Sequence, residues 1–206
     1  MYGGYPVASK NIFEGNPVEV SEELLKSAYG SHIAIIYPDL PTLREMYSQY
    51  IKSVLSNGNE IVMILPFLET VDNVRRILSE DSANINVRRY EKEQVLLILD
   101  SLKGYFGSPD GLLPFLNQTV AYANKAGKDG LSVLGDVGSF FYCNKKDGLL
   151  DYESMLSSKY RKMNYLKGFC MYNEQNYNKR LDEEERQRLL KHHIRTMNLL
   201  SPLNTA

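Results

Sequence analysis

The stretch SHIAIIYPDLPT, residues 31–42, decides the fold of this chain. After Ser31 and His32 it runs through apolar residues, three of them isoleucines, as far as Tyr37. A continuous apolar run of this length is typical of a strand that is buried on both faces of a parallel sheet. Pro41 suits the first turn of a helix. The stretch therefore predicts a central strand over residues 32–37, followed directly by a helix.

The sequence after this stretch repeats the same alternation of strand and helix. Apolar residues from Leu43 to Leu55 recur at three- and four-residue steps, and Gly58 is placed to end that helix in a left-handed conformation. The alternation predicts an α/β fold whose mostly parallel sheet is covered by helices on both faces. We expect further strands over residues 61–66, 86–90, 95–99, 131–135 and 166–172, and further helices over residues 21–28, 69–78, 112–125 and 152–160 and from Asp182 onward.

The length of 206 residues favours a single domain. Residues 1–20 are rich in Gly, Tyr, Pro and Asn without periodicity, and we interpret them as an extended N-terminal arm. Residues 21–206 then form the domain. Its last helix has a recognisable start, because Asp182 and Glu185 have the spacing of a capping box.

Composition excludes several classes of protein. The chain has 24 basic and 25 acidic residues, so no excess positive charge attracts a phosphate backbone, and we expect no direct nucleic-acid partner. The two cysteines, Cys143 and Cys170, are too few for a disulfide framework and fit a reducing compartment. The N-terminal residues do not resemble a signal peptide, and no apolar run is long enough to span a membrane. We expect a cytoplasmic protein.

The segment after the first central strand argues against ATP hydrolysis. A phosphate-binding loop there needs the pattern GxxxxGK[ST], because glycines let backbone amides surround a phosphate. Residues 37–42 are YPDLPT instead. Pro38 and Pro41 lack amide donors, and Asp39 repels phosphate. The sequence therefore predicts no functional phosphate loop at this position.

Several motifs resemble those of the MEDS family, the methanogen and methylotroph sensory domain. They are residues 30–37, LSNGNE at 55–60, LGD at 134–136, FCMY at 169–172 and His192. The resemblance runs from about residue 30 to residue 197, which is most of the chain. It implies a three-layer RecA-like domain, close to the KaiC branch, in a module that recognises small organic compounds in signalling and transcription-regulating proteins. Family-typical positions are His32, Gly58, Glu60, Asp136, Glu153, Cys170, Tyr172 and His192.

The candidate ligand-binding residues combine this resemblance with a general rule for open α/β sheets. Ligands bind beyond the carboxyl ends of the strands, so residues that close a strand are the first to consider. Alternation within the strand over residues 166–172 places Cys170 and Tyr172 on one face of the sheet and Met171 on the other. The predicted ligand-binding residues are His32, Tyr37, Asp136, Cys170, Tyr172 and His192, and no residue is assigned a catalytic role.

Simpler interpretations exist for most of these residues. Cys170 lies in an apolar strand, where a thiol usually behaves as a small hydrophobe. Glu153 lies on a helix, where it is a candidate for a solvated charge. A zinc centre is conceivable from the residue types of Cys170, His32 and His192, but no two of them have the close sequence spacing of zinc ligands. The sequence therefore predicts no metal and no cofactor.

Three functions compete at this point. The first is a sensor that binds an unidentified small organic ligand and signals through a regulatory protein partner or a change of homo-oligomeric state. The second is an assembly module that docks on an ATPase or a regulator. The third is an enzyme that uses His32, Asp136 and Cys170 for acid–base or thiol chemistry. The sequence favours the sensor.

Overall fold

The fold is built around one parallel sheet. The structure, a computed structural model, describes residues 12–80, 83–160 and 163–201. Within these residues the sheet has seven strands, and every neighbouring pair is parallel. The strands in spatial order are β1 (Ile12–Gly15), β7 (Arg195–Leu199), β2 (His32–Tyr37), β6 (Leu166–Asn173), β5 (Gly130–Asp136), β3 (Glu60–Leu65) and β4 (Leu96–Ile98).

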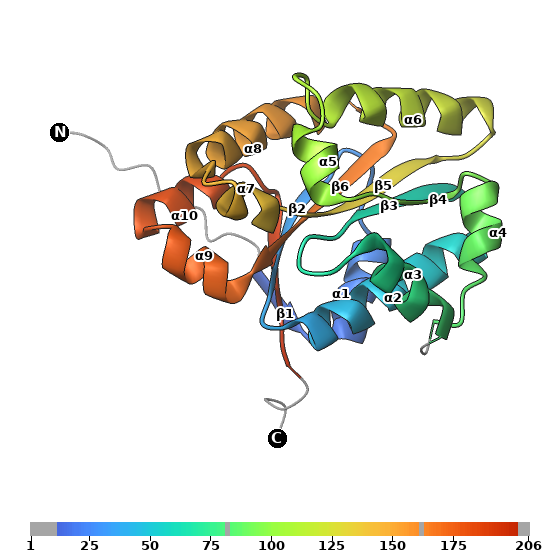
Figure 1. The fold of residues 1–206 in the computed structure, drawn as a ribbon, viewed down its shortest axis with the longest axis horizontal. Coiled ribbons are helices and arrows are strands. Elements are labelled where there is room, and N and C mark those ends of the chain that lie inside the picture. The colour runs from blue at the N-terminus through green and yellow to red at the C-terminus, as the bar shows by residue number, and fades with distance from the viewer. Residues whose placement is uncertain (1–11, 81–82, 161–162, 202–206) are drawn as a thin grey trace.

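Helices cover both faces of this sheet (Figure 1). Each face has its own apolar core, and alternate residues of the central strands contribute to one core or the other. The first core joins the sheet to α1 (Pro17–Leu25), α2 (Leu40–Asn57), α3 (Val71–Glu80) and α4 (Val87–Lys92). The second joins it to α5 (Ser101–Phe106), α6 (Leu113–Lys125), α7 (Gly138–Tyr142), α8 (Lys146–Tyr160), α9 (Glu174–Arg180) and α10 (Glu183–Leu190).

This arrangement confirms the predicted α/β class and the three-layer architecture expected of a RecA-like domain. The first central strand has the predicted bounds, and α2 ends at Gly58, whose φ of 72° is left-handed. The side chain of Asp39 caps the start of α2 by accepting a hydrogen bond from the Thr42 amide. The predicted capping box of Asp182 and Glu185 is present at the start of α10.

Two predictions differ from the structure. Residues 12–20, assigned to an extended arm, form β1 and the first part of α1, because Asn16 caps the helix that starts at Pro17 and forms a capping box with Glu19. The rest of the predicted arm, residues 1–11, lies outside the described residues. The strand predicted over residues 86–90 is wrong: Asn86 accepts a hydrogen bond from the Arg89 amide and begins α4.

Four further elements were not predicted, namely α5, α7, α9 and β7. Asn173 is both the last residue of β6 and the cap of α9, and Asp100 caps α5 two residues after β4 ends, so each short helix starts almost directly at a strand end. β7 lies between β1 and β2 in the sheet. No helix in the described part of the chain is both long and apolar enough to cross a membrane.

Candidate functional site

The most concentrated group of reactive side chains lies inside the second core. His32 begins β2, Cys170 lies in β6, Glu153 projects from α8, and His193 lies in the turn between α10 and β7. All four side chains are buried, and one donor atom of each lies within 4.8 Å of the others. Four segments that are far apart in the sequence therefore supply a single polar cluster, which we call the four-donor cluster.

The carboxylate of Glu153 is the hub of this cluster. Its Oε2 atom lies 3.1 Å from Nε2 of His32 and 3.4 Å from Nε2 of His193. The same oxygen is 3.6 Å from the Cys170 sulfur, which in turn lies 3.2 Å from Nε2 of His32. The solvated position considered for Glu153 is therefore wrong, since its side chain is fully buried.

Backbone carbonyls fix the orientation of both imidazole rings. Nδ1 of His32 lies 3.0 Å from the carbonyl oxygen of His192, and Nδ1 of His193 lies 3.1 Å from that of Leu189. A carbonyl oxygen can only accept, so each Nδ1 carries the hydrogen and donates it. In the neutral ring the Nε2 lone pair then points into the cluster. An imidazole held in this way by a second acceptor is typical of metal-binding histidines.

Aromatic rings and one phenol hydroxyl enclose the cluster. Tyr172 donates a hydrogen bond of 2.6 Å to Oε1 of Glu153, which leaves Oε2 to face the imidazoles and the thiol. Tyr160 stacks on His32 with ring centroids 4.9 Å apart. The Tyr172 hydroxyl therefore occupies Oε1 of Glu153. The Tyr160 ring keeps water from one face of the His32 ring.

Burial sets the protonation states of Cys170 and His193 in the four-donor cluster. It raises the pKa of the Cys170 thiol well above its ordinary value, and the adjacent Glu153 carboxylate adds to that shift. Burial and the neighbouring His32 lower the pKa of His193. Without a bound cation the cluster therefore has a protonated thiol and a neutral His193, and a protonated thiol is the opposite of what a cysteine nucleophile needs.

The structure brings together three of the six predicted ligand-binding residues. His32, Cys170 and Tyr172 meet at Glu153, and the predicted orientation of Cys170 and Tyr172 toward one core is confirmed. The side chain of His192 does not belong to the four-donor cluster; the next residue, His193, supplies the imidazole. His192 contributes its backbone carbonyl instead, as the acceptor for His32.

The other two predicted residues form a separate buried pair. Tyr37 at the end of β2 donates a hydrogen bond of 2.7 Å to Asp136 at the end of β5. The other carboxylate oxygen of Asp136 accepts one from the Gly138 amide at 2.8 Å. Burial raises the pKa of Asp136 to about 6, although these hydrogen bonds act in the opposite direction. Asp136 therefore joins the end of β5 to the start of α7.

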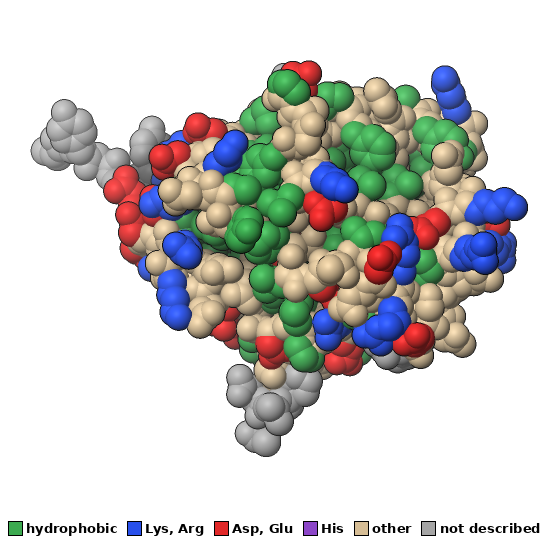
Figure 2. Space-filling view, in the orientation of Figure 1, with side chains coloured by type: hydrophobic (Ala, Val, Ile, Leu, Met, Phe, Trp, Pro, Cys, Tyr) green, Lys and Arg blue, Asp and Glu red, His purple; other side chains and the backbone are tan. Residues whose placement is uncertain are grey.

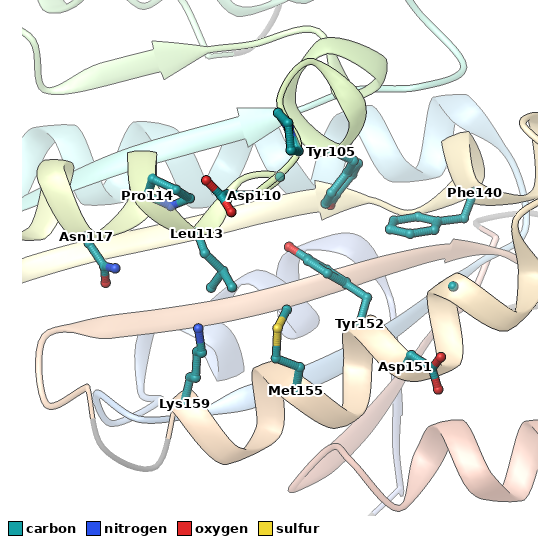
Figure 3. A pocket seen from close by; sticks show the side chains of 13 residues that line it. Tyr105, Asp110, Leu113, Pro114, Asn117, Phe140, Asp151, Tyr152, Met155 and Lys159 are labelled. Atoms are coloured by element: carbon teal, nitrogen blue, oxygen red, sulfur yellow. The ribbon is translucent and has the colours of Figure 1, made fainter.

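A groove of about 630 Å³ lies on the outer side of α8, between this helix and the segment of α5 and α6 (Figure 3). The rings of Tyr105, Phe140 and Tyr152 pack with centroids 5.1 to 5.5 Å apart at one end of it. Met155 and Lys159 project into the groove from α8 (Figure 3). Apolar side chains gather in the corresponding part of the surface in Figure 2.

Helix α8 connects the groove with the four-donor cluster. Tyr152 and Met155 line the groove, whereas Glu153 and Leu156 point into the buried core beneath the same helix. None of the six predicted residues is among the described groove lining. A displacement of α8 would move one wall of the groove and the hub of the cluster together.

A second cavity, of about 390 Å³, lies at the sheet edge where the sequence placed the ligand. It is lined in part by Ile36 and Pro38 after β2, by Glu174 after β6, and by Asn198 and Leu200 at the end of β7. This cavity is smaller than the groove and is not lined by the packed aromatic rings. The groove on α8 is therefore the stronger candidate for a ligand.

Comparison with known proteins identifies a family for most of the chain. The model of the family described as MEDS, MEthanogen/methylotroph, DcmR Sensory domain, matches residues 31–194. The matched region contains the four-donor cluster and all the residues described here for the groove. A search of curated proteins gives no match.

Proposed function

The chain belongs to the MEDS family of sensory domains, and from that premise we propose that it senses a small organic molecule bound in the groove on α8. The observation that carries this proposal is the form of the groove itself. Its volume of about 630 Å³ lies within the range of roughly 300–1,000 Å³ that small-molecule sites occupy. Three aromatic rings give it an apolar end, and a few polar groups stand at its margins.

The lining defines the chemistry of the ligand. Tyr105, Phe140 and Tyr152 offer ring faces and edges to an apolar group, and Met155 adds an adaptable thioether. Lys159 supplies a positive charge, and Asp110 and Asp151 supply negative charges at the margins of the groove. These features suit a small molecule with an apolar body and a polar end.

Signalling requires that the ligand favour one of two conformations of the domain. Helix α8 is the element whose position the ligand would bias, because it supplies one wall of the groove. We infer that the change is transmitted to a protein partner or to the oligomeric state, as the sequence analysis expected. Light scattering with and without a bound compound distinguishes these two routes.

The test uses three probes that share a ring and differ in charge: benzoate, benzyl alcohol and benzylamine. Binding is followed by ligand-observed magnetic resonance on the full chain. All three should bind, because the ring is the part that the aromatic residues contact, and Lys159→Gln should weaken benzoate more than benzyl alcohol. Met155→Trp should fill the groove and weaken binding at least about tenfold, because added volume in a packed site excludes the ligand.

Ser154→Trp is the matched control, since it places the same ring on an exposed position of the same helix. It should leave the affinity unchanged. Equal loss of binding in both variants, or saturable binding that is insensitive to Met155→Trp, would place the ligand elsewhere. Failure of all three probes to bind would count against the ligand class inferred from the lining.

A further inference from the structure

The geometry points to a zinc-binding site formed by His32, Glu153, Cys170 and His193. Tetrahedral zinc with ligands at about 2.0–2.3 Å holds neighbouring donor atoms about 3.3–3.8 Å apart. In the four-donor cluster, the four contacts described above between these side chains measure 3.1, 3.2, 3.4 and 3.6 Å. Four of the six edges are therefore already close to those of such a tetrahedron, and the other two, from His193 to His32 and to Cys170, are no longer than 4.8 Å.

The direction of the lone pairs is a second, independent observation. Nε2 of His193 is a buried acceptor without a hydrogen-bond partner. The nearest atom of Glu153, the carboxylate oxygen Oε2, is also an acceptor and cannot donate to it. Nε2 of His32 faces the same oxygen. The thiol hydrogen of Cys170 can satisfy only one of these three acceptors. A cation at the centre would satisfy all of them at once.

Charge balance selects the valence of that cation. Cys170 as a thiolate and Glu153 as a carboxylate carry two negative charges, and the two imidazoles are neutral ligands. A divalent ion brings the total to zero, which is the least costly state for a site whose four side chains are all buried. A monovalent or trivalent ion would leave an unpaired charge inside the core.

The donor set selects zinc among the divalent ions. Magnesium and calcium prefer oxygen ligands, whereas a thiolate with two imidazoles suits a softer ion. Cu²⁺ and Ni²⁺ favour square-planar sites, in which any three donors include a long diagonal pair. Here the donor atoms of His32, Glu153 and Cys170 all lie within 3.6 Å of one another. Four protein ligands complete the tetrahedron, so the ion would have a structural role.

Binding of the ion is coupled to a proton. The S–H bond of Cys170 breaks, a Zn–S bond forms, and the proton passes to solvent, while Glu153 and the imidazoles donate existing lone pairs. The ion would tie α8 to β2, to β6 and to the turn before β7. It would thus fix the helix that forms the wall of the groove, but its presence does not depend on whether the groove binds a ligand.

The test measures the metal content and metal affinity of the full chain. Protein purified without chelator and dialysed should retain one zinc per chain by plasma mass spectrometry. Cys170→Ser and His193→Gln should raise the zinc dissociation constant at least about 100-fold, because loss even of an outer partner commonly costs about 10–100-fold. Cys143→Ser is the matched control at a residue outside the cluster and should retain the full equivalent.

A second measurement keeps the proposal testable if a ligand variant does not fold. Cobalt added to metal-depleted wild-type protein should give the intense near-ultraviolet band of thiolate-to-cobalt charge transfer, together with the visible bands of tetrahedral cobalt. Absence of both stoichiometric zinc and the cobalt bands would overturn the proposal. So would cobalt bands that disappear in Cys143→Ser and persist in Cys170→Ser.

Discussion

Replacing Asp136 with asparagine should change how the stability of the domain depends on pH. In the folded protein the pKa of Asp136 is raised to about 6, mainly because its carboxylate is buried. In the unfolded chain it returns to the ordinary value of 3.8. The folded state therefore binds the proton more tightly, and the stabilisation from this proton is complete below the unfolded pKa and lost as pH rises through the folded pKa.

The magnitude follows from the size of the shift. A difference of about 2 pKa units corresponds to about 3 kcal/mol of unfolding free energy. The introduced asparagine cannot ionise, yet its amide can keep both contacts by accepting from the Gly138 amide and donating to the Tyr37 hydroxyl. The variant should lose the pH-dependent contribution without losing the side chain's position.

Urea denaturation at a series of pH values measures this effect. The unfolding free energy of Asp136→Asn minus that of the wild type should rise by up to about 3 kcal/mol between about pH 4 and pH 7. Asp100→Asn makes the same chemical change at an exposed helix cap and is the control for the effect of the substitution itself. A flat difference for Asp136→Asn would refute the assigned shift and the burial that causes it.

Further predictions concern packing and thiol accessibility. Gly168→Ala should lower the unfolding free energy by about 1–3 kcal/mol in denaturant titrations, because its added methyl group would meet the hydroxyl of Tyr160. Gly148→Ala, where the nearest atom outside the helix backbone is 3.8 Å away, should instead raise the melting temperature, and a drop there would contradict the packing described. In native protein a thiol reagent should modify Cys143 first and Cys170 only at the rate of unfolding, because Cys170 is buried; rapid modification of both thiols would contradict this.

The sequence predicted the regular elements best where several local signals agreed. The isoleucine run of β2 and the apolar periodicity of α2, closed by Gly58, left no competing interpretation. Residues 86–90, NVRRY, show the opposite case, because they have no clear hydrophobic period and the Asn86 side chain caps the start of a helix there. The short strands β1 and β7 are stabilised by pairing with neighbours that are remote in sequence, which local patterns do not report.

The candidate site was predictable only in part for a similar reason. Alternation along β6 correctly placed Cys170 and Tyr172 in one layer. The burial of Glu153 had a local signal, because Leu149, Leu150 and Leu156 lie three or four positions away and share its face of α8. The choice between His192 and His193 depends on how the chain turns from α10 into β7, because two adjacent residues point in different directions there.

X-ray absorption at the zinc edge is the most direct test that His32, Glu153, Cys170 and His193 act together as one centre. The account predicts one sulfur at about 2.3 Å and three nitrogen or oxygen neighbours at about 2.0–2.2 Å. A shell without sulfur, a shell with two sulfurs, or protein that carries no zinc to measure would contradict it.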